Sequence, residues 1–204
     1  MQLSTGNLID SYFLSDTIFQ YLNDLAVSAK NEIFITDSES NKLYKIQRPG
    51  KTLEVFLDAV DISNSNGITI SNKFGYLFLA SSNGICIVEI KSKNVINEPN
   101  NDYAGIDGLK LYNGNLYGII NDWRDNSKNG LYKYTLNKTQ NEILKSEKIL
   151  EFTKGFIIPT TFDIFDSYIY FVINAQLDNF DENKNRTIDL NKLESYKLFK
   201  IQTE

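Results

Sequence analysis

Short segments in which apolar and polar residues alternate recur along the whole chain. LNDLAVS, EIFITDS, KLYKIQ and LEVFLD follow one another between residues 22 and 58, and each is rich in residues that favour strands. Turn formers separate such segments, and the strongest is Asn113-Gly114, because Asn and Gly tolerate the positive φ of a tight hairpin. No long helical period interrupts this pattern. The alternation therefore predicts an all-β chain.

The alternating segments recur in sets of about four. The sets occupy residues 22–58, 66–98, 106–152 and 159–202. Asn23 and Asn66 stand 43 positions apart at the start of the first two sets, and Asn66 and Asp107 stand 41 apart. These spacings match the roughly 40–50 residues of a four-stranded propeller blade. The repeat therefore predicts a β-propeller, and a β-sandwich of similar strands is the alternative.

We expect one propeller domain over residues 1–204. The expected boundaries are an outer strand of a preceding blade in 1–20, with Gly6–Leu14 as the strand, and four-stranded blades in 21–60, 61–100, 101–155 and 156–204. The polar stretch 179–192 breaks the alternation, so it is expected to be a loop inserted within the last blade. The chain thus supplies about four blades.

Oxygen-bearing side chains recur at one position of the repeat. Asn23 and Asp24 begin the first set, Asn66 begins the second, and Asp107 begins the third. The innermost strand of each propeller blade lines the central channel, so equivalent positions near its start should converge on one axis. Carboxylate and amide oxygens are the ligands that calcium prefers. Any one of these dipeptides alone could simply be a turn, but three in register favour a cation site.

Composition excludes several other kinds of function. The 204 residues include no histidine and one cysteine, Cys86, so this chain cannot supply an imidazole base or a His/Cys zinc site. A net charge of −5 argues against a nucleic-acid surface or a polybasic membrane anchor. The start of the chain has no signal-peptide pattern, and no apolar run approaches about 18 residues. We expect a cytoplasmic protein with no membrane span, or a periplasmic or secreted one if the N-terminus is truncated.

The repeated motifs also carry a family resemblance. LND, SNGI and IDGL, each followed by a strand, and then YNGNLYG resemble the regucalcin and gluconolactonase family of six-bladed propellers. The resemblance covers nearly the whole chain from Leu22 onward. Because six blades need about 250–300 residues at this repeat length, it implies an incomplete ring that lacks the N-terminal blades.

The resemblance implies a site and an activity. One divalent metal, Ca²⁺ or another cation, would lie in the central channel with Asn66 and Asp107 as ligands. Asn23 would line the substrate site or hold the metal through water, and Asp24 would support the ligands or bind a buried structural calcium. The implied reaction is hydrolysis of small lactones or esters, with Asp107 activating water or attacking directly. The glutamate ligand that the family takes from its first blade has no counterpart in this sequence.

Two further functions stay open at this point. One is a propeller remnant without catalysis that binds a ligand or a protein partner. The other is a complete four-bladed scaffold, in which Gly6–Leu14 would pair beside the final strand, Tyr196–Gln202. Missing blades would leave sheet edges uncovered, so self-association through these edges is also expected.

Overall fold

A computed structural model of the chain describes nearly all of the predicted repeats. The residues that it describes are 2, 4–14, 19–47, 52–122, 125–153, 155–181, 187–188 and 190–203. Within them the regular structure consists of β-strands and single 3₁₀ turns, without an α-helix. None of these described segments forms a helix with the length and apolarity to cross a membrane.

Consecutive segments of the chain form four antiparallel sheets. The first contains β1 (Leu22–Val27), β2 (Glu32–Asp37), β3 (Lys42–Gln47) and β4 (Leu53–Asp58). The second contains β5 (Ile68–Ser71), β6 (Tyr76–Ser81), β7 (Gly84–Glu89) and β8 (Asn94–Val95). The third contains β9 (Ile106–Tyr112), β10 (Asn115–Ile120), β11 (Gly130–Leu136) and β12 (Ile143–Glu151). The fourth contains β13 (Phe162–Phe165), β14 (Tyr168–Val172) and β17 (Leu198–Gln202).

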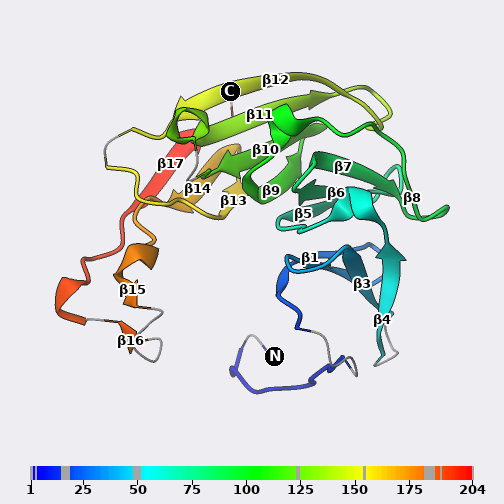
Figure 1. The fold of residues 1–204 in the computed structure, drawn as a ribbon, viewed down its shortest axis with the longest axis horizontal. Helices are drawn as coiled ribbons and strands as arrows, with labels where there is room; N and C mark the ends of the chain where they lie inside the picture. Colours follow the sequence, from blue (N-terminus) through cyan, green and yellow to red (C-terminus); the bar gives the residue numbers. More distant parts are fainter. Residues whose placement is uncertain are drawn as a thin grey trace.

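The four sheets are the blades of a β-propeller. Figure 1 shows them side by side around a central axis, with the first and last blades at the two ends of an open arc. The innermost strands β1, β5, β9 and β13 contact one another in that order. The predicted all-β propeller class is therefore confirmed. The structure supports four blades, and it gives no support for a six-bladed ring.

The fourth blade departs from the four-stranded pattern of the other three. In the described chain it has three strands, because the chain leaves the sheet after β14 and forms a separate hairpin, β15 (Phe180–Asp181) with β16 (Thr187–Ile188), before it returns as β17. This hairpin lies within the stretch predicted as an inserted loop, of which residues 182–186 and 189 lie outside the described chain.

The strand expected near the N-terminus is not seen. The described residues 4–14 form no strand. Among the described strands, β17 pairs with β14. The structure therefore does not show the four-bladed arrangement in which Gly6–Leu14 would pair beside the last strand.

The hydrophobic core lies between the blades. In β6, Leu77 and Leu79 face the core shared with the first blade, whereas Phe78 and Ala80 face the core shared with the third. This strand is buried on both faces, which explains its nearly continuous apolar sequence. Each end blade has a neighbouring sheet on one face only. Large apolar side chains of these blades are exposed, as Phe165 is to 74%.

Two glycines at the blade starts permit adjacent inner strands to touch. A Cβ added to Gly67 would lie 2.5 Å from the backbone oxygen of Asp107, and one added to Gly108 would lie 2.9 Å from that of Thr160. Positive φ is found instead at the true hairpin, where Asn113 has φ 47° and Gly114 has φ 76°. The Asn-Gly and Asp-Gly motifs at the blade starts are therefore sites of close backbone approach, not hairpin turns.

Candidate axial binding site

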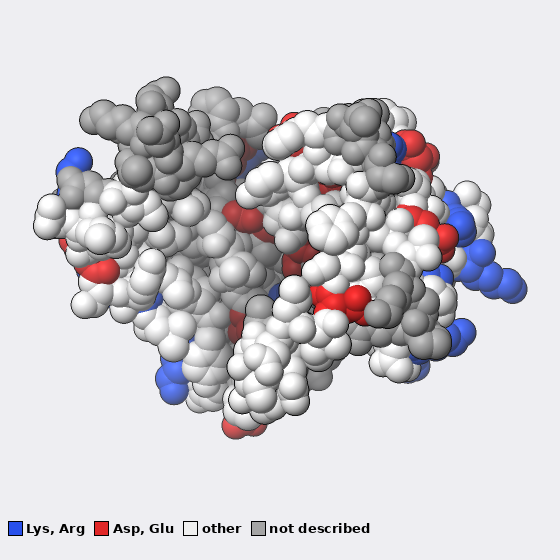
Figure 2. Space-filling view, turned by 90° about the horizontal axis from the view of Figure 1, so that it is seen from below, with Lys and Arg blue, Asp and Glu red and all other residues white. Residues whose placement is uncertain are grey.

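A cavity of about 610 Å³ opens on the axis of the arc. Figure 2 shows a hollow in the middle of the lower face, with acidic side chains inside it. The cavity is lined by Tyr21, Asn23, Asp24, Ser38, Glu39, Asn66, Asp107, Gly108, Thr160, Thr161 and Leu177. These residues come from all four blades or from the segments leading into them. The four residues predicted from the repeat, Asn23, Asp24, Asn66 and Asp107, therefore line one cavity.

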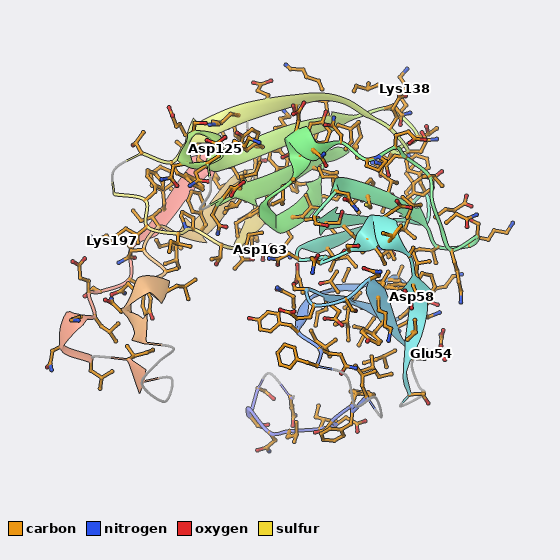
Figure 3. The ribbon with its side chains drawn as sticks, viewed as in Figure 1. Glu54, Asp58, Asp125, Lys138, Asp163 and Lys197 are labelled. Carbon is orange, nitrogen blue, oxygen red and sulfur yellow. The ribbon has the colours of Figure 1, made fainter. Side chains whose placement is uncertain are left out.

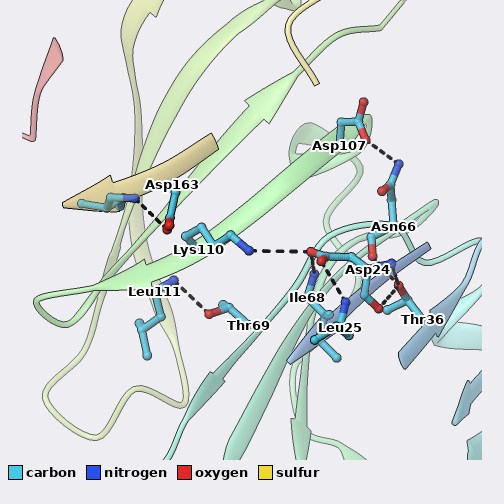
Figure 4. Close-up of polar contacts among 11 residues, drawn as sticks. Asp24, Leu25, Thr36, Asn66, Ile68, Thr69, Asp107, Lys110, Leu111 and Asp163 are labelled. Atoms are coloured by element: carbon cyan, nitrogen blue, oxygen red, sulfur yellow. Dashed lines mark hydrogen bonds and ion pairs between the residues drawn. The ribbon is translucent and has the colours of Figure 1, made fainter. Parts of the chain in front are cut away.

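Asn66 and Asp107 touch each other in this cavity. The Nδ2 of Asn66 donates a hydrogen bond of 2.8 Å to the Oδ1 of Asp107, although 41 residues separate them (Figure 4). Asn66 precedes β5, and Asp107 is the second residue of β9, so they belong to neighbouring blades. Both also line a second cavity of about 280 Å³. The Asn66–Asp107 pair therefore stands where the two cavities adjoin.

Asn121 is a third member of this site that the sequence analysis missed. Its Nδ2 donates 2.9 Å hydrogen bonds to the Oδ2 of Asp107 and to the backbone oxygen of Pro159. Each oxygen of the Asp107 carboxylate thus accepts one amide N–H. The available signal was the polar pair Asn121-Asp122, which follows the apolar strand β10 directly.

Asp24 and Asn23 have other partners. The Oδ2 of Asp24 accepts a 3.2 Å hydrogen bond from the backbone N–H of Ile68 and lies 4.0 Å from the Nζ of Lys110 (Figure 4). The Nδ2 of Asn23 donates to the Oγ of Ser38 at 2.9 Å. Asp24 therefore links the inner strands of the first two blades, and the structure does not bring it into hydrogen-bond contact with Asp107.

Few charged residues of the outer strands approach this site. Glu54 and Asp58 belong to the outermost strand β4, and Lys138 lies at the far tip of the β11–β12 hairpin, whereas Asp163 of β13 lies near the middle of the arc (Figure 3). Within the described part of the chain, no group of three or more Asp, Glu or Cys side chains could hold a metal ion. The acidic residues that line the cavity are Asp24, Glu39 and Asp107, and the carboxylate hydrogen-bonded to Asn66 and Asn121 is that of Asp107.

Burial raises the pKa of Asp107 above its ordinary value of 3.8. The hydrogen bonds from Asn121 and Asn66 lower this pKa and partly offset the effect of burial, while the negative charge of Asp24 raises it further. The folded protein therefore binds a proton at Asp107 more tightly than the unfolded chain does.

This raised pKa predicts a pH dependence of stability. Below the unfolded pKa, Asp107 is protonated in both states and its contribution is fully present. As the pH rises through the folded pKa, that contribution is lost, because the folded state must then bury the charge. We expect the free energy of unfolding of the wild type, measured with urea, to fall relative to that of Asp107→Asn as the pH rises from about 4. The assignment would be contradicted if the unfolding free energy of the wild type minus that of Asp107→Asn stayed constant or increased as the pH rises.

Comparisons with known proteins support the β-propeller fold of this chain and nothing finer. No family model and no curated protein matches the chain. Among solved structures, a nidogen/laminin complex is similar with a TM-score of 0.53 and 18% identity, over 73% of this chain and 54% of that chain. Virginiamycin B lyase from Staphylococcus aureus is similar with a TM-score of 0.52 and 19% identity, over 74% of this chain and 48% of the lyase chain.

The match to one designed protein covers more of that protein's length than the matches above do. The computationally designed Ika4 protein has a TM-score of 0.52 and 9% identity, over 92% of this chain and 95% of that one. This chain thus spans about half of the natural chains named above. At these identities the likeness supports a propeller domain, and it does not extend to the regucalcin and gluconolactonase family specifically.

Proposed function

We propose that the axial cavity binds a small lactone or ester and hydrolyses it with the help of a divalent cation, with Ca²⁺ as the first candidate. The observation that carries this proposal is the contact between Asn66 and Asp107. Two residues from separate blades, in the motifs that resemble the metal ligands of the gluconolactonase family, meet at 2.8 Å in one cavity. The cavity volume suits a ligand of small size.

The available ligands are oxygen atoms, the type that a hard cation prefers, although they carry little negative charge. The carboxylate of Asp107 and the Oδ1 of Asn66 would be the protein ligands, and water would supply most of the six to eight oxygens that calcium takes. No hydrogen-bond partner of this Oδ1 occurs among the described residues. The Nδ2 of Asn66 now donates to Asp107, so the side chain must turn its oxygen towards a shared cation. One carboxylate predicts weak binding, because affinity follows ligand charge.

The residues of the chain would supply the proton transfer. A bound cation would polarise the carbonyl group of the ester. The carboxylate of Asp107 would accept a proton from the attacking water. The water oxygen bonds to the carbonyl carbon, the ester C–O bond breaks, and the proton passes from Asp107 to the leaving oxygen. Asn23 and Ser38, which line the same cavity, would hydrogen-bond to the polar groups of the ligand.

The test is a calorimetric titration of the protein with Ca²⁺, followed by a lactone hydrolysis assay with and without a chelator. We expect saturable binding of one cation, and hydrolysis that the chelator abolishes and added Ca²⁺ restores. Hydrolysis that is insensitive to the chelator would contradict the metal dependence, and the absence of both cation binding and hydrolysis would contradict the proposal.

A second candidate is a propeller that binds a ligand without catalysis. The two amides of Asn66 and Asn121 already satisfy both oxygens of Asp107, which favours a fixed polar wall over a reactive carboxylate. Binding of a polar ligand without cation binding or turnover would identify this function. A lyase reaction has no comparable support. A histidine-to-alanine variant of the similar virginiamycin B lyase is described as catalytically inactive, and this sequence contains no histidine.

The proposal also includes contacts with other copies of the chain. The exposed apolar side chains of the first blade, Leu25 and Val27, and Phe165 of the last blade lie on the two blades that end the arc. Self-association through these blades would remove them from water. The cytoplasmic location stays a prediction from the sequence.

A further inference from the structure

Thr36 is a completely buried polar residue whose hydroxyl group is hydrogen-bonded to the backbone of two residues that line the axial cavity. It lies in β2 of the first blade, and its Oγ1 donates a 2.6 Å hydrogen bond to the backbone oxygen of Asn66, which leads into the second blade. The same Oγ1 accepts a 3.1 Å hydrogen bond from the backbone N–H of Asp24 (Figure 4). One hydroxyl group therefore joins two of the residues that line the cavity.

Asn66 is held at three points by three different blades. Its backbone N–H donates to the backbone oxygen of Ala80 at 2.8 Å, in the second blade. Its backbone oxygen accepts from Thr36 of the first blade, and its Nδ2 donates to Asp107 of the third. Within the described chain, the Oδ1 is the one hydrogen-bonding atom of Asn66 without a partner. The two backbone contacts fix the point from which the side chain of Asn66 enters the cavity.

We infer that Thr36 is a positioning residue, which fixes the backbone of Asn66 for ligand binding without touching the ligand. The inference rests on the proposed function. A valine at this position would keep the shape of the side chain but leave the oxygen of Asn66 and the N–H of Asp24 without their buried partner. The backbone of Asn66 would then be held by the second blade alone, so the point from which its side chain enters the cavity would be less firmly fixed.

The experiment compares Thr36→Val, Thr36→Ser and a matched control, Thr69→Val. Thr69 also accepts a hydrogen bond across two blades, from the backbone N–H of Leu111 at 3.1 Å, but it has no contact with Asn66 (Figure 4). In calorimetric titrations with Ca²⁺, we expect Thr36→Val to weaken binding at least about tenfold, as the loss of groups that orient metal ligands does. Thr36→Ser and Thr69→Val should stay within about twofold of the wild type.

A second measurement, made without any cation, keeps this inference separate from the proposed function. The side-chain amide protons of Asn66 should exchange slowly with water in the wild type, because Nδ2 donates to Asp107. By NMR we expect faster exchange in Thr36→Val and unchanged exchange in Thr36→Ser and Thr69→Val. If the wild type binds no Ca²⁺ but these exchange rates behave as expected, the proposed function fails and the positioning role stands.

Two results would overturn the positioning role. One is a Thr36→Val protein whose Asn66 amide protons exchange as in the wild type. The other is an equal acceleration in Thr69→Val, which would show a general loosening of the contacts between blades. Because Thr36→Val could unfold, thermal unfolding of all three variants is recorded first. If it is unfolded, Thr36→Ser decides alone: wild-type exchange supports the role, and faster exchange with the hydroxyl retained contradicts it.

Discussion

Asp107→Ala should lose detectable Ca²⁺ binding and slow lactone hydrolysis by about three orders of magnitude, the range for removal of a group that acts in proton transfer. Among the described residues, Asp107 supplies the only carboxylate that is hydrogen-bonded to Asn66 and Asn121, and the substitution removes it. Calorimetry measures the first loss, and steady-state hydrolysis under saturating substrate measures the second. Asp107 is the second residue of β9, and circular dichroism of the variant checks that the sheet is retained.

Asp58→Ala is the matched control for this loss of a carboxylate. Asp58 ends the outer strand β4, and its side chain is exposed and far from the axis (Figure 3). We expect this variant to bind Ca²⁺ and hydrolyse lactones as the wild type does. Equal losses in both variants would indicate a general effect of charge, and wild-type activity in Asp107→Ala would remove Asp107 from the mechanism.

Gly67→Ala is expected to destabilise the folded protein by about 3 kcal/mol or more, at the upper end of overpacking effects. The added methyl group would lie 2.5 Å from the backbone oxygen of Asp107 and 2.6 Å from the backbone nitrogen of Leu109. Both atoms belong to the inner strand β9, which cannot yield as a flexible side chain would. Urea unfolding followed by tryptophan fluorescence or circular dichroism measures the loss.

The control for Gly67→Ala is Gly75→Asn. Gly75 has φ +73°, which asparagine tolerates, and a Cβ there would meet nothing within 4 Å. We expect this variant to stay within about 1 kcal/mol of the wild type. A Gly67→Ala protein as stable as Gly75→Asn would show that the inner strands of adjacent blades do not approach each other as closely as the structure indicates.

The blade repeat could be predicted from the sequence because its causes are local. Alternation of side chains along a strand and the positive φ of Asn113-Gly114 depend on a few neighbouring residues. The meeting of Asn66 and Asp107 could also be predicted, since a constant period places equivalent residues on successive inner strands. Their role as ligands stays a prediction.

The remaining features depend on contacts between distant parts of the chain. Asn121 joins the site because the end of β10 lies beside Pro159, 38 residues further along the chain. The glycine after Asn66 permits a close backbone contact with β9. The sequence does not reveal this contact, because Asn-Gly is also a common turn dipeptide. The polar stretch 179–192 predicted an insertion in the last blade, but its local pattern did not show that β15 and β16 would pair as a separate hairpin.

An NMR titration with Mn²⁺, a paramagnetic substitute for Ca²⁺, locates the proposed cation between the blades. Substoichiometric Mn²⁺ broadens the signals of nuclei close to the bound ion. We expect the amide signals of Asn66, Gly67, Asp107 and Gly108 to broaden first, and added Ca²⁺ to restore them. Broadening that spares these four residues, or that begins on the outer strands, would contradict a cation site between the second and third blades.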